Sequence, residues 1–419
     1  MTTLVLGLGI SGKNVVHYLV SKGISVIGVD KQIKHLELEI PLFDENDQKI
    51  EALLPKVDRI IKSPGIAWDH PIIKKVIGKV EILSEVELAF RALQGQKKML
   101  FGITGSNGKT TTTSLTAHIL TGLGKKAVAC GNIGLPLLSQ VDTDAEILVI
   151  ELSSYQLETL QTAVLDAAVI LNITPNHLER YSCFDEYAKA KLRIERLLKK
   201  GGKLFVQEQV QQQFGSHMAS FSPFPLLQVE ENIATIFPLR YRDGRFSHDF
   251  ENFQGAFALC QIFATERKFW EIARSFVKPP HRLEFVRHFN GVTYVNDSKA
   301  TSVDAVIKGV ESLRGSVILI AGGVDKGGSY KEWASLFLGK VKKVFLIGKA
   351  QDKIYQEVTP FLDAEKVETL QEAVNRASHL AQKGEIVLLS PGCSSFDQFQ
   401  NFEHRGEIFK QLVFGLEGI

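Results

Sequence analysis

Short runs of β-branched and aliphatic residues alternate with longer helix-like segments along most of this 419-residue chain. This alternation is typical of parallel α/β sheets, in which a helix connects each strand to the next. At roughly 100–200 residues per domain, the length accommodates two to four such sheets. Two breaks in the pattern, the polar stretch 94–98 and the Lys278-Pro279-Pro280 segment, predict three α/β domains with boundaries at 1–95, 96–278 and 279–419.

The same alternation predicts the individual elements. Strands are expected at 3–6, 25–29, 59–61, 80–83, 99–103, 127–129, 147–150, 168–171, 203–206, 292–295, 317–320, 343–347 and 385–389. A helix is expected at 13–22, a charged helix at 184–200, and irregular strands and turns at 207–247. We therefore expect an α/β fold with a Rossmann-like N-terminal domain, a P-loop-type central domain with a mostly parallel sheet, and a Rossmann-like C-terminal domain.

Charge and hydropathy narrow the class of protein. Lys and Arg total 49 against 47 Asp and Glu, so the formal net charge is +2, and without a basic run nucleic acid is not an expected partner. No apolar stretch reaches the roughly 18–20 residues that cross a bilayer, and the N-terminus lacks the features of a signal peptide. Four widely separated cysteines predict reduced, mostly buried thiols. We expect a monomeric, cytoplasmic protein without a membrane partner.

A glycine-rich turn follows the first expected strand. Residues 7–12 fit G-x-G-x-x-G, and Asp30 ends the next strand at the spacing of a ribose-binding acid. Taken alone, this turn favours a dinucleotide such as NAD, then another nucleotide, then a plain turn. Ser63-Pro64-Gly65 follows a further strand and is a second candidate loop, although an ordinary Pro-Gly turn explains it equally well.

A second glycine-rich loop lies between an apolar strand and a helix. It comprises Thr104, Gly105, Ser106, Asn107, Gly108, Lys109, Thr110 and Thr111. The glycines permit backbone N–H groups to face phosphate oxygens, Lys109 can reach the terminal phosphates, and the Thr110 hydroxyl can ligate Mg²⁺. Ile103 stands where the common P-loop has its first glycine, so this is a loop variant. The loop favours ATP chemistry over hydride transfer, which needs no second nucleotide site.

Three further side chains are candidates for the same site. Glu151 ends the apolar strand 147–150 and is placed to bind Mg²⁺ with Thr110, the alternative being a solvated carboxylate. His177 follows the strand 168–171, where a histidine alone is more often a surface or hydrogen-bonded residue. Lys191 lies in the basic helix, which taken alone indicates a solvated face.

Taken together, these motifs resemble the Mur ligases, the cytoplasmic enzymes that build the peptidoglycan stem peptide. The matching segments are 103–111, 131–134, 151–158, 172–181, His281-Arg282-Leu283-Glu284, Asn296-Asp297-Ser298-Lys299-Ala300-Thr301 and 389–399, in the family's order. The N-terminal Gly-Leu-Gly turn and the blocks at 151–158 and 389–399 most resemble the members that add D-glutamate. The resemblance runs from Gly7 to about Gly406.

The resemblance implies a role for each domain. The first would bind the UDP group of the substrate rather than NAD, the central domain ATP, and the third would close on ATP and the amino acid. The implied UDP-substrate residues are Gly9, Ile10, Ser11, Asp30, Ser63, Gly65, Asn132 and Ser153. The implied ATP residues are those of the loop at 104–111 with Asn252, Arg282 and Asp297, and the implied D-glutamate residues are Lys299, Thr301, Lys326, Ser395 and Phe402.

The resemblance also implies the catalytic groups. These are Lys109, Glu151, His177 and Lys191, and the Mg²⁺ ligands would be Thr110, Glu151, His177 and a carbamylated Lys191. The nearby Lys189 is an alternative candidate for that modification. The family usually has His-Asn where this chain has His248-Asp249, so the nucleotide pocket differs at Asp249.

The implied reaction is ATP-dependent addition of D-glutamate to UDP-N-acetylmuramoyl-L-alanine. ATP phosphorylates the alanyl carboxylate, because a carboxylate is a poor acyl donor, and the D-glutamate amine then attacks the acyl phosphate and releases phosphate. The alternatives are a ligase like folylpolyglutamate synthase, a nucleotide-binding module that does not consume ATP, and an NAD-dependent oxidoreductase.

Overall fold

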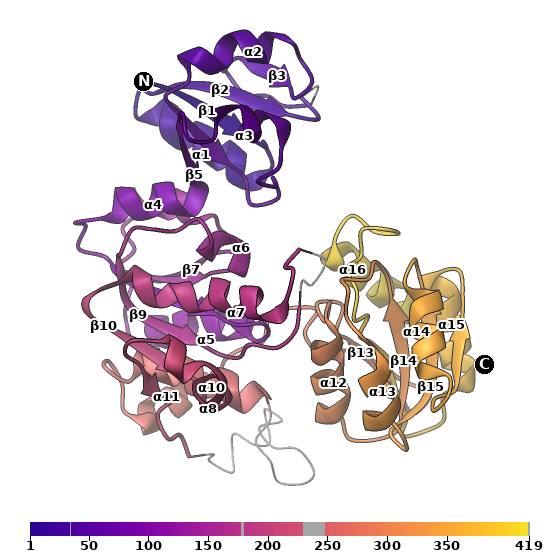
Figure 1. Cartoon of the computed structure of the whole chain (residues 1–419). Coiled ribbons are helices and arrows are strands. Elements are labelled where there is room, and N and C mark those ends of the chain that lie inside the picture. The colour runs from indigo at the N-terminus through magenta and orange to yellow at the C-terminus, as the bar shows by residue number, and fades with distance from the viewer. Residues whose placement is uncertain (34, 177–179, 229–247, 418–419) are drawn as a thin grey trace.

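Three separate β-sheets organise the chain (Figure 1). The computed structural model describes residues 1–33, 35–176, 180–228 and 248–417. The first sheet has the order β3-β2-β1-β4-β5, the second β11-β10-β9-β6-β8-β7, and the third β12-β13-β17-β14-β15-β16. All neighbouring strands are parallel except β12 and β13, which pair antiparallel at one edge of the third sheet. The predicted α/β class is therefore confirmed.

The first sheet and its helices occupy the N-terminal part of the chain. The elements are β1 (Thr2–Leu6), α1 (Ile10–Ser21), β2 (Ser25–Asp30), β3 (Leu42–Asp44), α2 (Lys49–Leu53), η1 (Leu54–Lys56), β4 (Arg59–Lys62), α3 (Pro71–Val76), β5 (Glu81–Ser84) and α4 (Glu85–Leu93). Because β1 lies between β2 and β4, the connections after β1 and β4 diverge to opposite faces, which leaves a crevice at their carboxyl ends. Both predicted glycine loops open onto this crevice.

The second sheet carries the predicted phosphate loop. Its elements are β6 (Met99–Thr104), α5 (Lys109–Gly122), β7 (Ala127–Gly131), η2 (Leu137–Gln140), β8 (Ile147–Glu151), α6 (Ser154–Leu157), β9 (Leu165–Ile170), α7 (Phe184–Leu192), η3 (Arg193–Leu197), β10 (Leu198–Val206), α8 (Glu208–Phe214), η4 (Gly215–His217), β11 (Ser222–Pro223), α10 (His248–Cys260) and α11 (Glu266–Ala273). Every residue of β8 is buried, as expected for a parallel strand covered on both faces.

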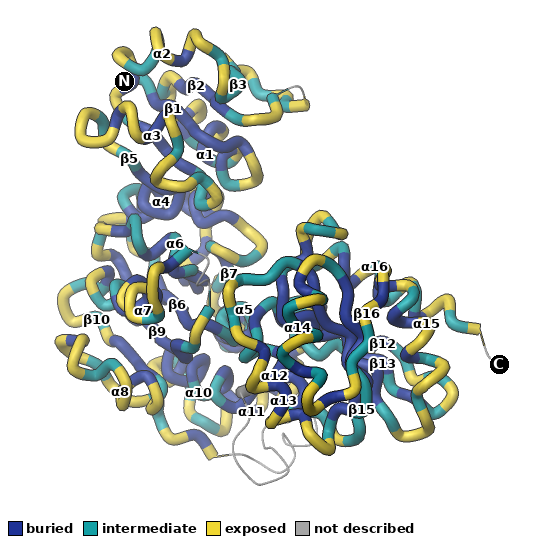
Figure 2. Tube along the Cα trace, turned by 45° about the vertical axis from the view of Figure 1, so that its right-hand side comes forward, coloured by how far each residue is buried: buried dark blue, intermediate teal, exposed yellow. Residues whose placement is uncertain are grey.

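The third sheet follows the Lys278–Pro280 break. Its elements are β12 (Glu284–Phe289), β13 (Val292–Asn296), α12 (Val303–Ser312), β14 (Val317–Gly322), α13 (Lys331–Leu336), β15 (Val341–Ile347), α14 (Gln351–Val358), β16 (Ala364–Lys366), α15 (Leu370–Leu380), β17 (Ile386–Leu389) and α16 (Phe402–Phe414). Figure 2 shows the inner strands of this sheet as mostly buried and much of the outer helices as exposed. Apolar clusters line both faces of the sheet, so helices cover it on both sides.

Two sequence expectations were wrong in the central part of the chain. The predicted helix 184–200 ends at Leu192, continues as the short η3, and gives way to strand β10 at Leu198. Gly201, with φ of +83°, and Gly202 disfavour a helix, and Leu198 instead pairs with Leu165 of β9. The predicted irregular segment 207–247 begins with helix α8, which the Gln207 side chain caps by accepting a hydrogen bond from the Gln209 N–H. Residues 229–247 lie outside the described part.

Helix α4 joins the first sheet to the second (Figure 1). One continuous apolar cluster contains residues of α1 and β1, the α4 residues Val86 and Phe90, and central residues such as Leu148. Buried Glu87 adds a polar connection: its carboxylate accepts hydrogen bonds from the Gln161 N–H at 2.9 Å and from the Thr162 hydroxyl at 2.6 Å. The boundary at residue 95 stays a prediction, because α4 packs against both sheets.

The third domain contacts the central domain at the phosphate loop. Asp304, near the start of α12, accepts hydrogen bonds from the Asn107 side-chain amide at 2.6 Å and from the Thr174 hydroxyl at 3.1 Å. Ser302 donates a further hydrogen bond to the Asn107 side-chain carbonyl at 3.4 Å. The carboxyl ends of the second and third sheets therefore face each other across this loop.

Replacement of Glu87 by Ala should destabilise the protein by about 2 kcal/mol, because it removes the buried carboxylate that accepts hydrogen bonds from the part-buried Gln161 N–H and Thr162 hydroxyl. Urea unfolding followed by circular dichroism measures the change. The matched control is Glu81→Ala, which removes an exposed partner of the same Arg91 and should cost under about 1 kcal/mol. Equal losses in the two variants would contradict the connecting role of Glu87.

Candidate active site

The phosphate loop wraps between β6 and the start of α5. Gly105 and Gly108 have φ of +157° and +83°, and a Cβ at residue 108 would lie 2.0 Å from Asn252 Oδ1. The Asn107 N–H donates to Asn172 Oδ1 at 2.8 Å, and the Ser106 N–H donates to the Asn172 carbonyl at 2.8 Å. The loop thus has the strand–turn–helix context that its sequence predicts, with Asn172 holding it from the next strand.

A cavity of about 430 Å³ opens in front of this loop. It is lined by Pro64 of the first domain, by central residues and by residues of the third domain. The predicted site residues that it gathers are Ser106, Asn107, Gly108, Lys109, Thr110, Asn132, Glu151, Ser153, Lys191, Arg282, Lys299, Thr301 and Lys326. Residues predicted from distant parts of the sequence therefore meet in one place.

Positive charge dominates this cavity. Among the described residues that line it, five are cationic (Lys109, Lys191, Arg282, Lys299 and Lys326), and Glu151 is the only carboxylate. Burial lowers the pKa of Lys109 to about 8 and that of Lys299 to about 8, with further lowering by neighbouring cations. Concentrated cations with little compensating negative charge are suited to bind anions.

Lys191 is buried beneath the phosphate loop. Its Nζ donates to the Gly105 carbonyl at 2.8 Å and lies 4.7 Å from the centre of the Tyr187 ring. Lys109 Nζ donates to the same carbonyl at 2.8 Å. Burial, aided by repulsion from Lys109, holds the pKa of Lys191 well below its ordinary value, so its amine is driven toward the neutral form. The prediction of a solvated basic helix face is therefore wrong for Lys191. The same prediction holds for Lys189, which is exposed.

Glu151 has one oxygen paired and one without a partner. Ile103 and Glu151 are register partners in β6 and β8, which brings the carboxylate beside the start of the loop. Glu151 Oε1 accepts a hydrogen bond from the Asn132 side-chain amide at 2.8 Å, whereas the buried Oε2 has no hydrogen-bond partner among the described residues. A buried carboxylate oxygen without a donor, beside the Thr110 hydroxyl, fits a bound cation.

No group of three or more His, Cys, Asp or Glu side chains within the described ranges is arranged to hold a metal ion. His177, the remaining predicted Mg²⁺ ligand, lies outside the described residues. The donors that fit a cation here are accordingly the Glu151 carboxylate, the Thr110 hydroxyl and, once modified, Lys191.

A smaller cavity of about 80 Å³ adjoins the first. Asn107, Gly108, Arg282 and Lys299 line both, and the smaller one adds the predicted residues Thr111, Asn252 and Asp297. Burial raises the pKa of Asp297 to about 7. Asp249, which replaces the family's asparagine, also lines the smaller cavity. Its carboxylate forms an ion pair with Lys278, in the segment between the second and third domains.

Of the predicted amino-acid residues, Lys299, Thr301 and Lys326 line the larger cavity, whereas Ser395 and Phe402 do not. Lys326 Nζ donates to the Thr301 hydroxyl at 3.2 Å, and Lys299 Nζ lies 3.6 Å from the centre of the Phe402 ring. Two hydrogen bonds join Val324 to Ser394, which tie the Lys326 loop to the loop of buried Ser395. The structure therefore brings these residues together from four segments.

The first-domain turn is only partly joined to this site. The Ser63 hydroxyl donates to the Gly7 carbonyl at 2.7 Å, and the Asp30 carboxylate accepts from the Leu8 N–H, so both side chains brace the turn itself. Gly9 and Ile10 are exposed, and neither they nor Ser11, Asp30 or Gly65 line the larger cavity. Pro64 does, which places the 63–65 loop at its edge.

Sequence reasoning missed three aromatic residues of the cavity, Tyr155, Tyr187 and Phe396. The Tyr187 hydroxyl is hydrogen-bonded to the Ser106 hydroxyl at 3.0 Å, and Tyr155 lines the cavity beside Ser154. Tyr187 precedes Lys191 by four residues on α7, so helical spacing was the signal that could have identified it.

No helix in the described part of the chain is both long and apolar enough to cross a membrane.

Family models match three consecutive parts of the chain. Residues 1–83 match the Mur ligase MurD-like N-terminal domain, residues 103–230 the Mur ligase middle domain, and residues 281–393 the Mur ligase glutamate ligase domain.

Curated relatives match nearly the full length. The UDP-N-acetylmuramoylalanine–D-glutamate ligase of Protochlamydia amoebophila is 42% identical, and the alignment covers 98% of this chain and 97% of that protein. The protein of the same name from Chlamydia pneumoniae is 36% identical, with 99% of each covered. The solved UDP-N-acetylmuramate-alanine ligase of Thermotoga maritima has a TM-score of 0.61 at 17% identity and covers 99% of both chains, a likeness of fold alone.

Replacement of Gly108 by Ala should weaken ADP binding at least about tenfold, because the new methyl group would collide with Asn252 and displace the loop's N–H groups. Titration calorimetry measures the affinity. The matched control is Gly95→Ala, which has a similar φ of +82° but no atom near the new methyl group. The control should lower the free energy of unfolding by about 1 kcal/mol without changing ADP affinity, and equal affinity losses in both variants would refute the loop assignment.

Proposed function

The chain belongs to the Mur ligase family, and from this membership we propose that it joins D-glutamate to UDP-N-acetylmuramoyl-L-alanine in peptidoglycan precursor synthesis, with conversion of ATP to ADP and phosphate. The family assignment confirms the resemblance that the motifs indicated. The observation that carries the proposed activity is the cavity in which a phosphate loop, a half-paired buried carboxylate and cations of the third domain meet.

The charge of the cavity suits the proposed chemistry. The first step brings the γ-phosphoryl group of ATP to the alanyl carboxylate, so two anions must approach each other. Lys109 from the central domain and Arg282 from the third face that approach and offset the repulsion. The mixed anhydride then offers phosphate as a leaving group when the D-glutamate amine attacks, and closed walls limit its hydrolysis by water.

The ATP contacts follow from the two adjoining cavities. The loop at 104–111, through the N–H groups at the start of α5 and the ammonium of Lys109, would hold the phosphates, with Arg282 reaching them from the third domain. Asn252 and Asp297 line the smaller cavity and would contact the base and ribose. The Asp249 carboxylate forms an ion pair with Lys278. Asp249 in place of the family's asparagine therefore adds no net charge to this side of the nucleotide pocket.

Mg²⁺ would be held by the Glu151 carboxylate, the Thr110 hydroxyl, His177 and a carbamylated Lys191. A bound Mg²⁺ supplies charge neutralisation for the phosphate oxygens. Carbamylation would turn the buried Lys191 cation into an anion, which removes its repulsion from Lys109 and adds a hard oxygen ligand. The lowered pKa favours this reaction, because only the neutral amine attacks carbon dioxide.

The remaining residues would bind the two substrates. Lys299, Thr301 and Lys326, which line the cavity, would bind the dicarboxylate D-glutamate together with the neighbouring Ser395 and Phe402. Asn132 and Ser153 would contact the reacting end of the muramoyl substrate, and the turns that carry Gly9, Ile10, Ser11, Asp30, Ser63 and Gly65 would bind its UDP group. One chain supplies every residue of the site, so we propose a monomer, which works in the cytoplasm where ATP is available.

A substrate panel tests the reaction class. ADP release should require UDP-N-acetylmuramoyl-L-alanine and D-glutamate together, and L-glutamate or a folate acceptor should give background rates. Glutamate transfer only to the folate would favour a folylpolyglutamate-synthase-like ligase, and tight NADH binding without ADP release would favour an oxidoreductase.

In the same assay Lys109→Ala should abolish phosphate release, whereas exposed Lys126→Ala should not. Binding of the UDP substrate should survive in Lys109→Ala, and its loss in a folded variant would contradict the domain roles.

Lys191 should carry a carbamate at neutral pH. Burial lowers the pKa of Lys191, so a larger fraction of its amine is neutral than in an exposed lysine, and acid should release the modification by protonating the carbamate. Nuclear magnetic resonance with isotopically labelled bicarbonate should show one carbamate signal that Lys191→Ala removes and Lys189→Ala keeps. A signal that disappears only with Lys189→Ala would assign the modification to the exposed lysine.

A further inference from the structure

Arg282 lies between two residues in a strained backbone conformation. His281 and Leu283 have φ of +64° and +48°, and within the described part Asn290 is the only other non-glycine residue with a positive φ. Left-handed conformations cost free energy for residues with a Cβ and persist only where the surroundings hold them. The backbone on both sides of Arg282 is therefore imposed by tertiary contacts.

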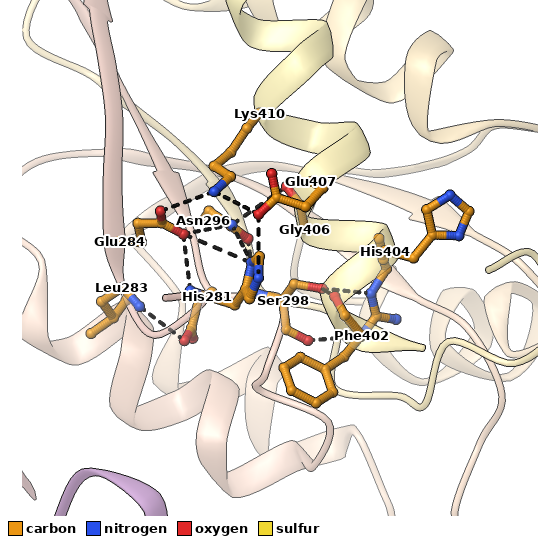
Figure 3. Close-up of polar contacts among 12 residues, drawn as sticks. His281, Leu283, Glu284, Asn296, Ser298, Phe402, His404, Gly406, Glu407 and Lys410 are labelled. Carbon is orange, nitrogen blue, oxygen red and sulfur yellow. Dashed lines mark hydrogen bonds and ion pairs between the residues drawn. The ribbon is translucent and has the colours of Figure 1, made fainter. Parts of the chain in front are cut away.

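Asn296 holds the His281 side (Figure 3). Its side-chain amide donates to His281 Nδ1 at 2.9 Å and to Glu284 Oε2 at 3.0 Å, and the same Glu284 oxygen accepts the His281 N–H at 2.9 Å. The ring also packs closely against Gly406 of α16, where a Cβ would lie 2.2 Å from Nδ1. Ring and backbone of His281 are thus fixed by one amide, one carboxylate and one glycine.

Asp297, the next residue, holds the other side. Its Oδ1 accepts the Leu283 N–H at 3.2 Å, and its Oδ2 accepts the Ser390 hydroxyl at 2.9 Å. Asn296, the last residue of β13, and Asp297, the next residue, therefore hold the two strained residues on either side of Arg282.

The Arg282 side chain itself is not anchored in this way. It lines both cavities of the site, and its guanidinium has no hydrogen-bond acceptor among the described residues. Its direction toward the phosphate loop is therefore set by the backbone from which it leaves, and hence by the groups that hold His281 and Leu283.

We propose that Asn296 is a positioning residue for nucleotide binding, which locks His281 and so aims Arg282 at the nucleotide phosphates. This inference rests on the proposed ATP-dependent function. Asn296 acts through Arg282, because its side-chain amide already donates hydrogen bonds to His281 and Glu284. Removal of the amide lets the strained backbone relax, and the guanidinium then samples directions that miss the phosphates.

A thermodynamic cycle on the full-length protein tests the coupling. Titration calorimetry with ADP and with ATP measures binding directly, so the result does not depend on ligase turnover or on the identity of the amino acid. Asn296→Ala and Arg282→Ala should each weaken binding about tenfold, the usual scale for loss of a charged hydrogen bond. The double variant should lose much less affinity than the sum of the two single losses, because the main effect of Asn296 on the nucleotide is transmitted through Arg282.

Two further variants separate positioning from general destabilisation. Gly406→Ala keeps the Asn296 side chain but pushes a methyl group against the His281 ring and the Asn296 amide, and should weaken nucleotide binding as Asn296→Ala does. Thr369→Ala removes the N-cap of α15 in the same domain and should lower the melting temperature without changing nucleotide affinity.

Unchanged affinity in Asn296→Ala would overturn the proposal, and so would additive losses in the double variant. If the coupling is found but no D-glutamate is transferred, the positioning role stands and the proposed reaction falls.

Discussion

The site depends on cations that the fold holds close together in a buried place. Lys109, Lys191, Arg282 and Lys299 repel one another, and burial adds a desolvation cost that lowers the pKa of each. Folding free energy from the apolar clusters of the sheets must sustain this arrangement. An anion with several oxygens, such as a triphosphate, relieves the repulsion, and so would carbamylation of Lys191. Ligand binding and modification thus act on the same electrostatic strain.

The three sheets contribute unequally to that arrangement. The central sheet supplies a rigid base, because β6, β8 and β9 place the phosphate loop, Glu151 and Asn172 at one edge. The third sheet adds cations from the opposite side, and its contact through Asp304 with Asn107 brings them within the same cavity. The first domain reaches that cavity through Pro64 alone among its described residues, which fits a role in holding the distal part of a long substrate.

Local motifs were the most predictable part of the molecule. The loop at 104–111 lies between a strand and a helix as expected, since glycine conformations and strand burial are properties of short segments. The helix 184–200 was mispredicted because its charged residues have high helix propensity, whereas Gly201, Gly202 and pairing with β9 favour a strand. The Asp249–Lys278 pair escaped sequence reasoning because contacts between distant residues leave no periodic signal.

The amino-acid sequence by itself determined the α/β class, the phosphate loop and the family, because these depend on local patterning and on motifs in a given order. Only the tertiary structure decided that Lys191 is buried, that one oxygen of Glu151 lacks a donor, and that Asn296 and Asp297 grip the backbone around Arg282. Burial and orientation arise when separate segments pack, and packing brings together residues whose distance along the chain carries no information about their contact.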